Sequence, residues 1–385
     1  MLVEVDSGEN ALFNDVKKTF KYGIGWQNIK IHEELNKDTV ELYINNEKKD
    51  FSRLYKFEEH GKYYIILKFK FLLTDCSYIF ENCQNLISID LSCFNASKVI
   101  NMEHMFDKCY KLTDLNMTSL NTKSVINMSN MFSFCLGLKN LNLSDLNTEN
   151  VIDFSSMFNN CNNLENLNIS SFNTSKGKDM KNMFNGLMNL TNLDLSFFNT
   201  ENVVFFNRMF KSCSKMTTIK LSPSFYTKNA IDMNEMFSGC KELIDLDLSS
   251  FNTKNVTDMS SMFYECSKLK NLNVSSFDCN NVINAKNMFS KCYKLINLEL
   301  PLFGGKKIED ISSMFSSCSN LEYLDLSSLY INNADTIKST NIFLGCIKLV
   351  KIKVNKEHIS IIESFIKEQN NMNKYRKLEQ NITYI

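Results

Sequence analysis

The stretch of residues 243–266 reads LIDLDLSSFNTKNVTDMSSMFYEC and contains two different spacings of apolar side chains. Near its start, Leu246 and Leu248 alternate with Asp245 and Asp247. Alternation with a period of two places apolar side chains on one face of a strand and polar side chains on the other. This part of the stretch therefore predicts a short β-strand with one buried face.

The second half of the stretch has a different spacing. Its apolar positions are three and four residues apart: Val256, Met259, Met262, Phe263 and Cys266. That spacing is typical of one face of a helix, so it predicts a short helix, with a 3₁₀ turn or an extended piece as the alternatives. The seven residues 249–255 between the two halves are rich in Ser, Asn and Thr, which turn the backbone through side-chain hydrogen bonds. They are expected to form a corner.

The same pattern recurs along most of the chain. A Met-Phe pair or a close equivalent places a phenylalanine at Phe80, Phe106, Phe132, Phe158, Phe184, Phe210, Phe237, Phe263, Phe289, Phe315 and Phe343. The spacing is 26 residues, with one insertion of one residue and one of two. Because a unit this short cannot bury its own strand and turn, successive copies must stack on one another. The repeat therefore predicts a solenoid with a parallel β-sheet on one side.

Repeats such as LDLSSFNTKNVTDMSSMFYEC (246–266) and LNISSFNTSKGKDMKNMFNGL (167–187) resemble the 26-residue repeat of the BspA-like leucine-rich repeat proteins. The resemblance covers about residues 75–355. It implies an α/β repeat solenoid, a leucine-rich-repeat-like right-handed superhelix with a parallel β-sheet on one face and short helices or turns on the other. For the studied branch of that family, it also implies adhesion at the cell surface.

The two ends lie outside the repeat. Residues 1–74 include TVELYIN (39–45) and KYYIILKFKF (62–71), which alternate apolar and polar residues and predict a small β meander that caps the first repeat. After the eleven repeats of 75–355, residues 356–385 are expected to form a capping helix and tail, because Ile361, Ile362, Phe365 and Ile366 fit one helical face. A binding role for the N-terminal cap and a partner-docking role for the helix stay open as alternatives.

Charge and hydropathy narrow the classes of partner. Lys plus Arg and Asp plus Glu both number 43, so no net field draws the chain to nucleic acid or to anionic lipid. The sequence has no run of about 18 apolar residues, so it predicts no membrane span. The first thirty residues lack the pattern of a secretory signal. If Met1 is the true start, these features predict a cytoplasmic protein, with the cell surface as the alternative if an export signal was removed.

Thirteen cysteines raise the question of metal or catalytic chemistry. Ten of them share one position of the repeat: Cys83, Cys109, Cys135, Cys161, Cys213, Cys240, Cys266, Cys292, Cys318 and Cys346. The fifth repeat has Leu187 there, which indicates an apolar interior position for reduced thiols. The chain has no C-x-x-C pair, no ligand spacing among its four histidines, no phosphate-binding Gly-rich loop and no G-x-S-x-G motif. We therefore expect no metal site, no cofactor, no small-molecule substrate and no enzymatic activity.

The outward side of the predicted strands remains as the candidate site. Its polar residues and one aromatic residue are Asp90, Asn116, Asn142, Asn168, Asp194, Asp245, Asp247, Asn273, Glu299, Tyr323 and Asp325. Such an array of amides and carboxylates is expected either to bind a protein partner with basic residues or to be a solvated sheet face.

The function that follows is a non-catalytic protein–protein interaction scaffold or recognition module that binds a macromolecule along its strands. The alternative is a surface adhesin of the BspA-like type that binds host or extracellular-matrix protein. An export signal upstream of Met1, or glycans on Asn255, would favour the adhesin.

Overall fold

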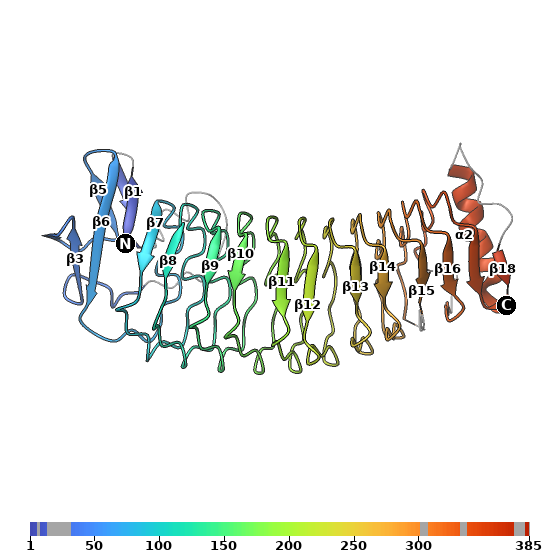
Figure 1. Ribbon diagram of the computed structural model, residues 1–385, viewed down its shortest axis with the longest axis horizontal. Coiled ribbons are helices and arrows are strands. Elements are labelled where there is room, and N and C mark those ends of the chain that lie inside the picture. Colours follow the sequence, from blue (N-terminus) through green and yellow to red (C-terminus); the bar gives the residue numbers. More distant parts are fainter. Residues whose placement is uncertain (6–7, 14–31, 301–306, 332–336, 373–381, 385) are drawn as a thin grey trace. The chain divides into compact units, whose positions relative to one another are not determined.

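The computed structural model describes residues 1–5, 8–13, 32–300, 307–331, 337–372 and 382–384. The chain divides into two compact units, Met1–Gly177 and Lys178–Ile385. Each unit is a parallel β-solenoid in which one coil corresponds to one repeat (Figure 1). Paired residues in neighbouring coils, such as Asn140 and Asn166, are one repeat apart in sequence, which is the stacking that the repeat predicted.

Antiparallel strands precede the parallel coils in the first unit. Its described strands are β1 (Leu2–Val5), β2 (Gly8–Ala11), β3 (Val40–Ile44), β4 (Glu47–Lys49), β5 (Leu54–Phe57), β6 (Gly61–Phe69), β7 (Leu86–Asp90), β8 (Asp114–Asn116), β9 (Asn140–Asn142) and β10 (Asn166–Asn168). One sheet runs β4-β3-β6-β1-β7-β8, in which β7–β8 is the parallel pair, while β2 pairs antiparallel with β5 and β9 pairs parallel with β10. The edge of β7, the first parallel strand, is therefore paired with β1.

In the second unit the described strands pair in parallel. They are β11 (Asn192–Leu195), β12 (Thr218–Leu221), β13 (Asp245–Asp247), β14 (Asn271–Asn273), β15 (Asn297–Glu299), β16 (Tyr323–Leu326), β17 (Lys351–Val354) and β18 (Ile382–Tyr384). The hydrogen-bonded sets are β11–β12, β13–β14 and β15–β16–β17–β18. The strand β18, which the repeat pattern did not predict, pairs with the far edge of β17.

Stacked phenylalanines form the core of each unit. In the second unit the Phe263 ring centroid lies 5.8 Å from that of Phe237 and 5.4 Å from that of Phe289, and the rings are within 10° of parallel. The first unit has the same column, with Phe106 and Phe132 5.8 Å apart. Burial of each ring contributes about 1.5–3 kcal/mol, and aromatic pairing adds roughly 0.5–1.5 kcal/mol. Because rings of neighbouring coils stack on one another within each unit, the core is made between repeats and not within one.

The helix predicted in the second half of the repeat is wrong. Residues 256–266 form successive turns, with Ser261 and Glu265 at φ values of 55° and 60°. From Met259 to Glu265, every second N–H donates to the next coil, as from Phe263 to the Met288 carbonyl (2.8 Å). Other N–H groups close local turns, as from Met262 to Met259 (3.2 Å). These two left-handed residues, four positions apart, interrupt a helix while the buried side chains keep their spacing of three and four.

Side-chain hydrogen bonds hold the corner, as the Ser, Asn and Thr content predicted. The buried Thr253 hydroxyl donates to the Asp278 carbonyl (3.0 Å) and accepts from the Asp278 N–H (2.7 Å). Thr227 makes the same reciprocal pair with Asn252 one coil earlier. Each pair satisfies buried backbone groups that have no strand partner, so the threonine side chain replaces a sheet hydrogen bond.

The one α-helix among the described residues lies near the C-terminus. It is α2 (Ile359–Met372), preceded by the 3₁₀ turn η2 (Lys356–His358). Ile362, Phe365 and Ile366 are buried on one side of α2, while Ser364 is exposed, so the helical pattern in the sequence is present. Within the described part of the chain, no helix has the length and apolar character needed to cross a bilayer.

Candidate functional site

The outward row of side chains on the parallel strands, which we call the strand face, arises from the alternation in the repeat. On β13, Leu246 is 5% exposed and the following Leu248 is fully buried, whereas Asp245 and Asp247 are exposed. Successive side chains of a strand point to opposite faces, so burying the leucines places the aspartates between them in solvent. The alternating pattern therefore predicted the direction of these side chains correctly.

The predicted site residues are divided between the two units. Exposed on the strand face are Asp90, Asn142, Asn168, Asp194, Asp245, Asp247, Asn273 and Glu299, and half-buried are Asn116, Tyr323 and Asp325. Direct cross-strand neighbours within a unit include Asn142 with Asn168, Asp247 with Asn273, and Glu299 with Asp325. The structure thus brings them together in pairs along neighbouring strands and not around one centre.

Many of these residues have a structural task that the sequence analysis missed. On most of the parallel strands, an Asp or Asn side chain accepts a hydrogen bond from the N–H two residues later, as from Ser249 to Asp247 (3.0 Å) and from Ser275 to Asn273 (3.1 Å). This Asx turn starts the corner. The Asp/Asn-x-Ser/Thr spacing that recurs after the leucines was the available signal. One oxygen of each such side chain is therefore already used by the backbone.

Lysines of neighbouring strands neutralise some of the acids. Lys220 lies 3.1 Å from the Asp194 carboxylate, and Lys353 lies 3.0 Å from that of Asp325. Hydrogen bonds from Ser196, assisted by Lys220, lower the pKa of Asp194 to about 2. In contrast, neither Asp245, Asp247 nor Glu299 forms an ion pair with any residue that the structure describes. The unneutralised acids of the second unit's strand face therefore gather on β13 and β15.

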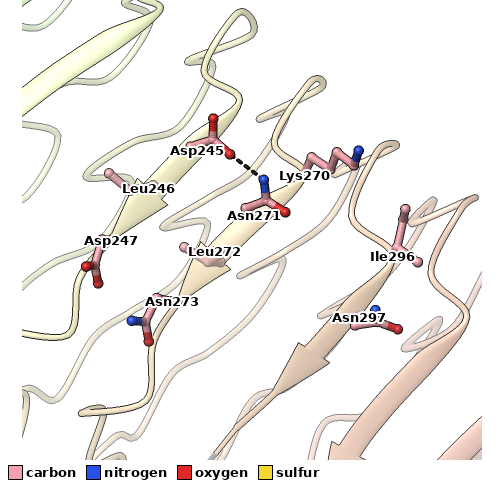
Figure 2. A pocket seen from close by; sticks show the side chains of 9 residues that line it. All are labelled: Asp245, Leu246, Asp247, Lys270, Asn271, Leu272, Asn273, Ile296 and Asn297. Carbon is pink, nitrogen blue, oxygen red and sulfur yellow. Dashed lines mark hydrogen bonds between the residues drawn. The ribbon is translucent and has the colours of Figure 1, made fainter.

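A shallow groove of about 540 Å³ lies over these strands (Figure 2). Its lining is Asp245, Leu246, Asp247, Lys270, Asn271, Leu272, Asn273, Ile296 and Asn297. The Asn271 amide donates to the Asp245 carboxylate across the strands, so these two side chains hold each other in place. Hydrogen bonds from the Ser249 backbone and hydroxyl lower the pKa of Asp247, which keeps this carboxylate ionised at neutral pH. The groove can accept several hydrogen bonds from one ligand.

A second groove, of about 440 Å³, lies at the residues that come just before β13, β14, β15 and β16. It is lined by Ile244, Lys268, Lys270, Lys294, Ile296, Asn320, Glu322 and Lys348. Lys270 and Ile296 line both grooves, so the basic groove adjoins the acidic one. The sequence analysis missed these lysines, although Lys268, Lys294 and Lys348 each stand two residues after the repeat's cysteine.

The cysteine column faces the interior. From Cys109 onward, the thiols of the column donate to the carbonyl of a phenylalanine in the preceding coil, as from Cys266 to Phe237 (3.1 Å) and from Cys292 to Phe263 (3.2 Å). Burial raises the pKa of Cys266 to about 12, which keeps the thiol protonated and able to donate. All thirteen cysteines are free, and among them only Cys93 is exposed. The column is therefore a set of buried, protonated donors in the core.

Metal-ligand side chains meet away from the strand face. In the first unit one ligand atom each from Glu81, His104 and Asp107 lie within 4.8 Å of one another. The sequence analysis found no ligand spacing here, because these side chains come from two different coils. Among the described residues this is the one group of its kind.

The chain is similar to one family model and to solved structures of repeat proteins. A family model described as "Mycoplasma protein of unknown function, DUF285" matches residues 74–186, 136–245 and 231–351. A crystal structure of a leucine-rich repeat protein from Bacteroides ovatus is similar at 19% identity and a TM-score of 0.35, over 80% of this chain and 86% of that one. The functional domain of InlJ from Listeria monocytogenes, which includes a cysteine ladder, is similar at 14% identity and a TM-score of 0.21, over 66% of this chain and 68% of that domain. A comparison with curated protein sequences found no match.

The family model covers most of the chain through three overlapping stretches, all within the repeats. The matched stretches lie over the region whose sequence resembles the BspA-like leucine-rich repeat proteins. The chain belongs to the family described as Mycoplasma protein of unknown function, DUF285.

Proposed function

We propose that the chain is a non-catalytic interaction module that binds a protein partner along its strand face. Within that face, β13–β15 are the best candidate for the point of contact. The observation that carries the proposal is the groove over these strands, where Asp245 and Asp247 have no ion-pair partner among the described residues. Lysine and arginine side chains of a partner would supply the missing positive charge.

The amides in the groove support a protein partner over a simple cation. Asn271, Asn273 and Asn297 offer both donors and acceptors between the carboxylates. Such a mixed row can hydrogen-bond to side chains and to the backbone of an extended segment. The exposed carboxylates alone would contribute about 0.2–1 kcal/mol for each ion pair, so stable binding requires contact along several strands.

The location of binding is tested with a variant that reverses charge on the face. Asp245→Lys and Glu299→Lys remove two acids, and Asp247→Asn removes a third while keeping an acceptor for the Ser249 N–H. The matched control changes the exposed acids Glu201, Glu309 and Glu357 to Lys, Lys and Gln, which alters net charge equally. The immobilised wild-type chain and both variants are then compared for the proteins that they capture from a lysate of the source cells.

The expected result is a set of proteins captured by the wild type and by the control, released by moderate salt, and missing from the face variant. Identical capture by all three chains would contradict the assignment of the face. Adhesion at the cell surface, which the family resemblance implies, stays a separate prediction, and glycans on Asn255 in the native protein would support it.

A further inference from the structure

A compact cluster of ionisable side chains lies in turns of the first unit, outside its strands. Glu81 belongs to the coil of Phe80, and His104 and Asp107 belong to the coil of Phe106. Glu81 is 5% exposed, Asp107 is 2% exposed, and the His104 side chain is 13% exposed. Withdrawing ionisable groups from water costs free energy unless they are paired with opposite charge or coordinate a metal ion.

The fold does not require these residue types. The next coil has Asn130 and Ser133 at the positions of His104 and Asp107. His104 and Asn130 share a left-handed backbone, with φ values of 53° and 55°. The backbone conformation therefore does not explain why this coil has His104 and Asp107 where the next coil has Asn130 and Ser133.

The geometry of the cluster suits a cation. The His104 Nδ1 lies 3.0 Å from the Asp107 Oδ2, and ligand atoms about 2.1 Å from one metal ion are roughly 3.0–3.4 Å apart. The other oxygen of this carboxylate, Asp107 Oδ1, is buried and has no hydrogen-bond partner. The His104 ring is fixed by stacking on Tyr78, with centroids 4.7 Å apart and planes 12° from parallel. A buried oxygen with unused lone pairs beside a fixed imidazole is a partly assembled ligand set.

A positive charge already lies at this place. The Lys108 Nζ is 3.3 Å from a Glu81 oxygen and 3.1 Å from the Asp107 Oδ2. The lysine side chain is 23% exposed, so its flexible stem can swing the ammonium into solvent. Its contacts leave Asp107 Oδ1 unsatisfied, because a single ammonium does not reach every acceptor of the cluster.

We propose that Glu81, His104 and Asp107 bind one divalent transition-metal ion, which displaces the Lys108 ammonium from the two carboxylates. One imidazole with two carboxylates is a ligand set that suits Zn²⁺ or Mn²⁺. The ion joins the first two coils of the solenoid, because Glu81 comes from one and the other two ligands come from the next. The site is separate from the strand face and does not depend on the proposed function.

The test uses the full chain in the Cys93→Ser background, which removes the exposed thiol as a competing ligand. Zn²⁺ and Mn²⁺ binding is measured by isothermal titration and by metal analysis after dialysis. His104→Asn and Asp107→Ser each introduce the residue that the next coil has at that position, so both variants are expected to fold. Lys108→Gln removes the competing ammonium.

The proposal predicts one ion per chain for the parent protein, none for the His104 and Asp107 variants, and affinity at least tenfold higher for Lys108→Gln. A structural ion pair without a metal site predicts the opposite for Lys108→Gln, namely loss of stability and no metal bound. Stoichiometric binding that survives both ligand substitutions, or no binding by either the parent or Lys108→Gln, would overturn the site.

A second measurement does not depend on the variants folding. The absorption spectrum of the Co²⁺-loaded parent chain is expected to show ligand-field bands without a sulfur-to-metal charge-transfer band. A strong charge-transfer band would place the ion on the cysteines and would refute the proposed ligands.

Discussion

Truncation of one ring in the phenylalanine column, Phe263→Ala, is expected to destabilise the second unit strongly. Phe263 is fully buried and stacks on Phe237 and Phe289, with centroid distances of 5.8 Å and 5.4 Å. Loss of a buried phenylalanine side chain costs about 3–5 kcal/mol, which includes roughly 0.5–1.5 kcal/mol for each lost aromatic pair. Because a typical domain has about 5–15 kcal/mol of stability, one substitution removes a large share.

The assay is urea unfolding followed by far-ultraviolet circular dichroism. The matched control is Tyr226→Ala, which truncates an aromatic side chain of the same unit that is 45% exposed, and its unfolding free energy is expected to change by less than about 1 kcal/mol. Loss of coupling between neighbouring coils should also broaden the transition of Phe263→Ala and lower its slope. Equal losses of stability in the two variants would refute the assignment of Phe263 to the core.

Asp247→Ala is expected to lower the unfolding free energy by about 0.5–2 kcal/mol because it removes the acceptor for the Ser249 N–H. Asp247→Asn keeps an acceptor and should lower it less, so equal urea midpoints for the two variants would contradict this capping role. Only Cys93 should react with a thiol reagent in the native protein, and rapid labelling of several cysteines by mass spectrometry would show that the column is open to solvent. Burial raises the pKa of Cys266 from 9.0 to about 12, so its contribution to stability is complete below about pH 9 and is lost as pH rises toward 12. The urea midpoint is therefore expected to decrease when the pH is raised from about 7 to about 10.5, and an unchanged midpoint would contradict the burial of this thiol.

The sequence predicted the features that repeat. The leucine alternation indicated which strand side chains are buried, and the fixed spacing of residues such as Phe237 and Phe263 indicated that coils stack. These predictions succeeded because the hydrophobic effect acts on every copy in the same way. Likewise, the repeat position that is Cys266 in one copy and Leu187 in another was predicted to be apolar, and both side chains are buried.

The sequence did not predict features that depend on hydrogen bonds between coils. The spacing of Met259, Met262 and Phe263 is compatible with a helix or with turns, and the choice is made by N–H groups that donate to the next coil. The Asx turn at Asp247 was missed because its partner is a backbone group. The meeting of Glu81 with His104 and Asp107 was missed because ligand spacing was sought within one segment and not across one repeat.

The stacking of repeats in register, with the strand face in solvent, is tested most directly by paired cysteines in the Cys93→Ser background. Asp245 and Asn271 are register partners on adjacent parallel strands, so their Cα atoms are about 4.8 Å apart and within disulfide range. We expect Asp245→Cys with Asn271→Cys to form an intramolecular disulfide readily under mild oxidation, whereas Asp245→Cys with Asn297→Cys, roughly 10 Å apart across two strand spacings, should not. Failure of the first pair to close, or equal rates for both pairs, would contradict the stacked arrangement.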